Sequence, residues 1–174
     1  VLQRRVRENG TVTIGDAEVL RPRLLASNSI IHPVSAVIGF PLDAAVGTCA
    51  TPNRIEGTGI WFGDTRDAFA THISTCGEEA FGKEQIFVWD APDDGLFCIR
   101  TTNSRFDTVL HIRTNQCAAR RNEVACNDDA NNETTASQIE LDGTEGEPYY
   151  ILVDGYSEEA EGRYLLSISQ GACP

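Results

Sequence analysis

The stretch Phe106-Asp107-Thr108-Val109-Leu110-His111-Ile112-Arg113 is the segment from which the fold of this chain can be worked out. Its β-branched and apolar residues predict a strand, and the alternation places His111 on a surface face. Two cysteines follow, Cys117 and Cys126, and the run Asn127-Asp128-Asp129 comes directly after the second. We therefore expect a core strand, a loop closed by a disulfide, and carboxylates gathered at one strand end.

Short runs of this kind recur through the rest of the chain from Cys49 onward. They are separated by clusters of Gly, Asp, Asn and Pro, a pattern typical of an all-β sandwich. The eight predicted strands are Arg54–Phe62, Gln85–Trp89, Leu96–Thr101, Thr108–Arg113, Glu123–Cys126, Ser137–Leu141, Tyr149–Asp154 and Arg163–Ser169.

The alternation within these runs assigns some faces. Tyr164, Leu166 and Ile168 share one face of the last strand and are expected in the core. The run Tyr149–Asp154 is apolar on both faces, which predicts a central strand. The run Gln85–Trp89 leaves open which of its two alternating pairs faces inward.

Charge is distributed unevenly along the 174 residues, whose net charge is −12. The first 42 residues carry +2 and the remainder −14, which predicts a first domain at 1–42, a linker at 43–48 and a second domain at 49–174. An acidic chain lacks the basic face that nucleic acid needs, so we expect no nucleic-acid partner. No apolar stretch is long enough to span a bilayer, and we expect no membrane insertion.

The cysteine count predicts disulfides and an oxidising compartment. All six cysteines lie from Cys49 onward, and none forms a Cys-x-x-Cys pair, so zinc is disfavoured. Six cysteines allow 15 pairings, and within that range the expected pairs are Cys117–Cys126, Cys49–Cys173 and Cys76–Cys98. We expect an extracellular or cell-surface location, with Val1 beginning a trimmed piece of an exported precursor.

Residues 11–38 carry a first family resemblance. Strands are predicted near Thr11–Ala17, Glu18–Leu25 and Ile30–Ile38, and the segment 25–38, Leu-Ala-Ser-Asn-Ser-Ile-Ile-His-Pro-Val-Ser-Ala-Val-Ile, resembles the C-terminal conserved box of fasciclin domains. Ser29 and Ser35 depart from the Gly and Asp of that box. The resemblance covers only the tail of such a domain and implies a structural role for His32.

A β segment of 42 residues cannot bury an adequate core alone. Three arrangements would supply the missing contacts. The segment packs on the second domain, it is completed by residues beyond this chain such as a fasciclin remainder, or another chain completes it through strand complementation. We therefore expect it to be the interaction element. The residues predicted to make these contacts are Val12, Ile14, Ile30, Ile31, His32, Val34 and Val37.

The second part of the chain resembles another family. Seven motifs in order across 49–173 are similar to bacterial pre-peptidase C-terminal domains, which implies a jelly-roll-like sandwich that is accessory to secreted proteins and not catalytic. The motifs begin at Asn53, Gln85, Gly95, Phe106, Ala125, Tyr149 and Gly162.

Carboxylates and amides at the predicted strand ends suggest a cation site. Calcium takes six to eight oxygen ligands, and some relatives of the second family bind it. The candidate ligands are Asp107, Asn127, Asp128, Asp129 and Asp154. An alternative interpretation assigns Asp107 and Asp154 to turn capping through backbone N–H groups.

Catalytic motifs are absent from the sequence. There is no Gly-x-Ser-x-Gly, no His-Glu-x-x-His and no phosphate-binding Gly-Lys-Ser. We therefore predict a secreted adhesion or structural module that is not an enzyme and that contacts matrix, a cell surface or copies of itself, assembling into oligomers or filaments. The alternative is an accessory substrate-binding or secretion domain of a secreted hydrolase.

Overall fold

The computed structural model describes residues 47–77 and 82–174 in full and, before them, only the backbone of five short strands. The chain divides into two compact units, Val1–Ala44 and Ala45–Pro174. In the first unit, β1 (Arg4–Val6), β2 (Val12–Ile14) and β3 (Ala17–Glu18) form an antiparallel sheet in that order. A separate antiparallel pair joins β4 (Leu24–Leu25) to β5 (Ile30–Ile31).

Of these strands, β2 falls within the predicted run Thr11–Ala17, β4 within Glu18–Leu25 and β5 within Ile30–Ile38. β3 spans the predicted boundary between the first two runs, and β1 was not predicted. Four of the predicted contact residues belong to β2 and β5, namely Val12, Ile14, Ile30 and Ile31. The other three lie outside the described residues, namely His32, Val34 and Val37.

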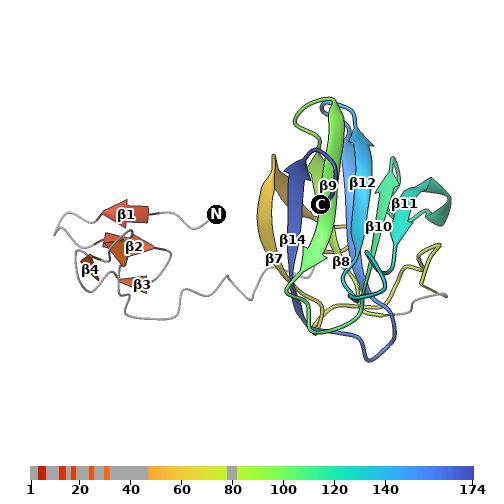
Figure 1. The fold of residues 1–174 in the computed structure, drawn as a ribbon, viewed down its shortest axis with the longest axis horizontal. Coiled ribbons are helices and arrows are strands. Elements are labelled where there is room, and N and C mark those ends of the chain that lie inside the picture. The colour runs from red at the N-terminus through yellow and green to blue at the C-terminus, as the bar shows by residue number, and fades with distance from the viewer. Residues whose placement is uncertain are drawn as a thin grey trace. The chain divides into compact units, whose positions relative to one another are not determined.

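The second unit is a sandwich of two sheets, which confirms the predicted all-β fold (Figure 1). One sheet has the order β11-β10-β13-β8-β6 and the other β12-β9-β14-β7. The strands are β6 (Asn53–Glu56), β7 (Gly59–Asp64), β8 (Gln85–Asp90), β9 (Gly95–Thr102), β10 (Thr108–Thr114), β11 (Glu123–Asn127), β12 (Gln138–Gly143), β13 (Pro148–Gly155) and β14 (Arg163–Gln170). Within the described part of the chain the only helix is the short 3-10 turn η1 (Arg120–Asn122), and no helix there is long and apolar enough to cross a membrane.

The predicted strand Arg54–Phe62 is two strands in the structure. The backbone turns at Gly57, whose φ of +67° favours glycine. β6 then pairs in parallel with β8 in one sheet, whereas β7 pairs with β14 in the other. The prediction of one continuous strand was wrong, because the apolar pattern of the sequence does not show where the chain passes from one sheet to the other.

The core between the sheets is built from the predicted faces. Tyr164, Leu166 and Ile168 are each 1% exposed or less and belong to it, as expected. Of the two pairs that the sequence left open on β8, Phe87 and Trp89 face inward. The Trp89 ring meets that of Phe97 edge-on at a centroid distance of 5.0 Å, and its Nε1–H donates to the Gly57 carbonyl oxygen at 2.8 Å. β13 is central, between β10 and β8.

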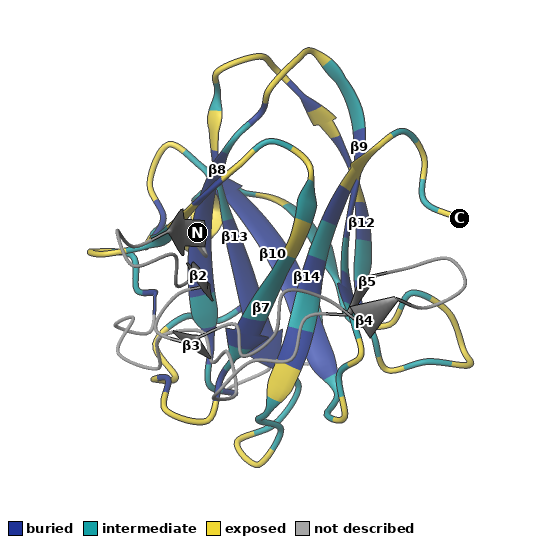
Figure 2. Ribbon diagram, turned by 90° about the vertical axis from the view of Figure 1, so that its left-hand side faces the viewer, coloured by how far each residue is buried: buried dark blue, intermediate teal, exposed yellow. Residues whose placement is uncertain are grey.

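The three central strands of the five-stranded sheet are buried on both faces. Figure 2 shows β8, β13 and β10 buried along most of their length, whereas β12 and β14 alternate between buried and more exposed residues. The segment 65–77 contributes to this cover, since Phe69 pairs with Glu84 just before β8 and the Ile73 carbonyl accepts a bond from Arg113 of β10. The predicted surface position of His111 was wrong for this reason, because its side chain is 0% exposed.

All three expected disulfide pairs are corrected by the structure. The observed bridges are Cys49–Cys117, Cys76–Cys126 and Cys98–Cys173.

Geometry explains why the expected pairs fail. Cys126 lies opposite His111 within the β10–β11 ladder, whereas Cys117 lies beyond the end of β10, and a bridge needs Cα atoms roughly 4.4–6.8 Å apart. The pairs Cys49–Cys173 and Cys76–Cys98 would each join a segment of one sheet to a segment of the other. Each observed bridge instead joins segments on one sheet.

This connectivity gives a direct prediction. Digestion without reductant, followed by mass measurement, should yield three linked peptide pairs that contain the observed bridges, and no alkylatable thiol. A peptide linking Cys117 to Cys126 would contradict the structure, since those two residues would have to leave the β10–β11 register. A reduced and alkylated sample of the same chain serves as the control, with six modified cysteines.

Candidate functional site

An acidic cluster lies at one end of the five-stranded sheet. Asp107 directly precedes β10, and Asp128 and Asp129 directly follow β11. Because these two strands are antiparallel neighbours, the start of one meets the end of the other. Each of the three carboxylates has an oxygen within 4.8 Å of the other two.

Repulsion and burial both act on this cluster. Burial raises the pKa of Asp107 above its ordinary value, and the nearby Asp129 carboxylate raises it further. A bound cation would offset the repulsion and favour the charged form of Asp107, so the arrangement is chemically suited to a hard ion with oxygen ligands.

The two other predicted ligands are not part of this group. The Asn127 amide is already engaged, because its nitrogen donates to the Asp129 carbonyl at 3.1 Å and its oxygen accepts from the Gln138 backbone at 2.7 Å. Asn127 thereby shapes the loop that presents Asp128 and Asp129. Asp154 lies on β13 opposite Val109 and is fully buried.

A second cluster of charged residues lies under the covering segment, on the outer face of the same sheet. Arg113 of β10 is 1% exposed, and its two terminal nitrogens donate to the carbonyls of Cys117 and Ile73, both at 2.9 Å. The Arg113 guanidinium lies 3.7 Å from the Glu123 carboxylate, which also accepts a bond from His111 Nδ1 at 3.0 Å. We call Arg113, Glu123 and His111 the buried ionic cluster.

The charge states within this cluster follow from its surroundings. Burial lowers the pKa of His111, although the Glu123 carboxylate opposes that shift. Burial disfavours ionisation of Glu123, but hydrogen bonds from His111 and Thr75 outweigh it, so the pKa of Glu123 lies below its ordinary value. The cluster is therefore a charged Arg113–Glu123 pair with a neutral His111 beside it.

Two further titratable groups, Glu84 and Asp154, lie near this cluster and have opposite charge states. Burial opposes ionisation of Glu84, but hydrogen bonds from His72 and Thr71 hold its pKa below the ordinary value. Burial, with the Glu84 carboxylate as a second cause, raises the pKa of Asp154 to about 9. Neither carboxylate oxygen of Asp154 has a hydrogen-bond partner among the described residues.

Sequence reasoning missed this whole buried face. The signal that was present is the pair Cys76 and Cys126, since a bridge from the segment before β8 to β11 requires that segment to lie across the sheet. The even number of cysteines alone does not reveal it, because the pairing is not encoded locally.

The fold and the bridges place residues 47–77 and 82–174 in the class of disulfide-linked all-β sandwich domains. No protein-family model matches the sequence, and no curated protein matches it. Among solved structures, the chain is similar to the pre-peptidase C-terminal domain of a collagenase from Bacillus anthracis, with 17% sequence identity and a TM-score of 0.47. That similarity covers 68% of this chain and 94% of the collagenase domain.

Proposed function

We propose that this chain is a non-catalytic module of an exported protein and that it acts by contact with matrix, a cell surface or copies of itself. The observation that carries the proposal is the set of three disulfides, which leaves no free cysteine among the described residues. Bridges of this kind persist in oxidising compartments outside the cytosol.

The contacts of the described histidines support a role without hydrolytic chemistry. His111 is fully buried and bonded to Glu123. His72 lies between Glu84 and the sulfur of Cys49, which is held in a disulfide, and the Thr71 hydroxyl near its Nδ1 donates to the Glu84 carboxylate. Within residues 47–77 and 82–174, neither ring is therefore paired with a serine or a free thiol of the kind that a hydrolase activates.

Self-association through the first unit is the specific form of contact that we propose. The described strands of that unit are two or three residues long, and a unit of this size has little capacity to bury a core. Pairing with strands of a second copy would supply main-chain hydrogen bonds and apolar cover.

Sedimentation of the full chain over a range of concentrations tests this proposal. The substitutions Ile14→Asp and Ile31→Asp place a carboxylate on β2 and β5. Each should weaken association at least tenfold, because burying an unpaired charge in a strand interface is costly. The matched control is Ile60→Asp, since Ile60 is 66% exposed on β7 and should not matter. A concentration-independent monomer would overturn the self-association, and binding of that monomer to isolated matrix or cells would then carry the contact function.

The second candidate is an accessory domain of a secreted hydrolase. The order of the seven motifs across residues 49–173 favours it. A hydrolase domain encoded in the same polypeptide would support this candidate, whereas the rest of a fasciclin domain would support adhesion. Removing residues 45–174 from such a hydrolase, or fusing them to its catalytic domain, should then change the hydrolysis of an insoluble substrate more than that of a small soluble one.

Calcium binding at Asp107, Asp128 and Asp129 is proposed as a stabilising feature of the module. For the weak affinity usual in extracellular modules, 10 mM calcium should raise the free energy of unfolding by about 1–3 kcal/mol. Thermal unfolding in calcium, magnesium and chelator measures the effect.

Matched variants separate this site from the general acidity of the chain. Asp129→Asn should abolish the calcium shift, whereas Asp142→Asn, at an exposed position on β12, should preserve it. If the melting temperature is the same in calcium and in chelator, the cluster is not a calcium site.

A further inference from the structure

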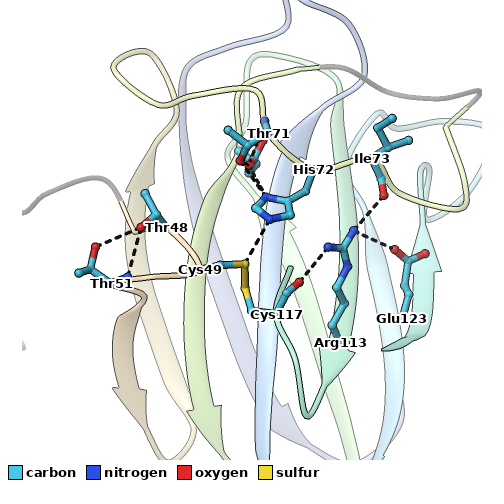
Figure 3. Close-up of a disulfide and its surroundings, with 10 residues drawn as sticks. Thr48, Cys49, Thr51, Thr71, His72, Ile73, Arg113, Cys117 and Glu123 are labelled. Atoms are coloured by element: carbon cyan, nitrogen blue, oxygen red, sulfur yellow. Dashed lines mark hydrogen bonds and ion pairs between the residues drawn. A yellow bond between two sulfur atoms is a disulfide. The ribbon is translucent and has the colours of Figure 1, made fainter. Parts of the chain in front are cut away.

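One of the three disulfides is in contact with a histidine. His72 Nε2 lies 3.3 Å from Cys49 Sγ, and Figure 3 shows the ring directed at the sulfur of the Cys49–Cys117 bridge. Within the described residues, no ring nitrogen contacts a sulfur of the other two bridges. The Cys49–Cys117 bridge is therefore chemically distinct from Cys76–Cys126 and Cys98–Cys173.

The orientation of the His72 ring is set by a buried carboxylate. His72 Nδ1 lies 2.7 Å from Glu84 Oε1, and the Glu84 side chain is 2% exposed. A carboxylate only accepts hydrogen bonds, so Nδ1 carries a proton and Nε2 is the nitrogen presented to the sulfur. In the imidazolium form Nε2 also carries a proton, and it can then stabilise negative charge on Cys49.

The buried ionic cluster holds both sides of this arrangement in place. Arg113 donates one hydrogen bond to the Cys117 carbonyl and another to the carbonyl of Ile73, the residue next to His72 (Figure 3). A single guanidinium thereby fixes the loop that carries Cys117 relative to the segment that carries the imidazole.

The bridge is reached through an open cavity of about 440 Å³. Both cysteines line it, together with the other residues of the segment 115–119, Arg121 and Tyr150. Its size suits a small organic thiol. Arg121 contributes a positive charge to the wall, which favours an approaching thiolate.

We propose that Cys49–Cys117 is a thiol–disulfide exchange site for low-molecular-weight thiols. The external thiolate attacks Cys117 Sγ from the cavity, a new sulfur–sulfur bond forms there, and the Cys49–Cys117 bond breaks. Cys49 leaves as a thiolate, to which Nε2 of His72 donates a hydrogen bond when the ring carries both protons, and no other oxidant or reductant is consumed. A better-stabilised leaving thiolate departs faster, so the direction of attack is set by which sulfur the imidazole contacts.

Brief treatment of the folded full chain with reduced glutathione tests this proposal. After quenching with N-ethylmaleimide, peptide mass mapping reports which bridge has opened and where glutathione is attached. Cys49–Cys117 should open at least about tenfold faster than either other bridge, with the glutathione adduct on Cys117 and the free thiol on Cys49.

The bridge Cys76–Cys126 is the matched comparison within the same molecule. Both of its cysteines are partly exposed, whereas in the Cys49–Cys117 bridge only Cys49 is partly exposed and Cys117 is 6% exposed. If exposure alone determined reactivity, Cys76–Cys126 would open first, and that order would overturn the proposal. An adduct on Cys49 in place of Cys117 would overturn it as well.

His72→Gln tests the role of the imidazole. The variant should slow opening of Cys49–Cys117 by about tenfold and leave the opening rates of the other two bridges unchanged. Equal slowing of all three bridges would assign His72 a structural role and overturn its part in the exchange. The order of opening and the adduct position in the unaltered chain decide the proposal even if the variant does not fold.

Discussion

Replacing Arg113 with alanine is expected to lower the free energy of unfolding by about 3–5 kcal/mol, as is usual when one partner of a buried ion pair is removed. The loss has two parts. The Glu123 carboxylate would keep only its hydrogen bonds to neutral groups, and the carbonyls of Cys117 and Ile73 would lose their donor beneath the covering segment. Urea denaturation at pH 7 measures the change as a shift in midpoint at constant slope.

Arg54→Ala is the matched control for this prediction. Arg54 also forms an ion pair, with Asp90, but the Arg54 side chain is 56% exposed. Exposed pairs contribute about 0–1 kcal/mol, so this variant should unfold nearly as the unaltered chain does. Similar losses for Arg54→Ala and Arg113→Ala would show that burial of the ionic cluster does not decide its contribution.

The second large effect is a dependence of stability on pH that arises from Asp154. Its pKa is about 9 in the folded chain and near 3.8 for an ordinary carboxyl. Between these values the folded state retains a proton that the unfolded state has lost, so stability falls as pH rises, by up to about 1.4 kcal/mol per pH unit. Below the unfolded pKa both states are protonated and the penalty is absent.

Asp154→Asn should remove this component. The variant should become progressively more stable than the unaltered chain between pH 5 and 8, measured by urea denaturation in the presence of chelator. Asp142→Asn, at an exposed position on β12, should follow the unaltered curve. A constant offset between Asp154→Asn and the unaltered chain would mean that Asp154 does not change its protonation state on unfolding.

The sequence determined the features that depend on local pattern. Alternation along Arg163–Ser169 and the doubly apolar run Tyr149–Asp154 predicted a core face and a central strand, and both are confirmed by the structure. Five ligands were predicted at strand ends, and three of them, Asp107, Asp128 and Asp129, lie together in the structure. They meet because the residues that end one strand and begin its antiparallel neighbour lie at the same edge. These inferences need only the two-residue period of a strand and the geometry of one ladder.

Tertiary structure alone decided which face of a sheet is covered and which cysteines meet. His111, Arg113 and Glu123 have the spacing of surface residues, yet they are buried because a segment some 40 positions earlier crosses over them. The bridges join residues 50–75 positions apart. Local pattern specifies whether a side chain points up or down from its own strand, whereas covering and pairing depend on how distant segments are brought together when the sheets pack.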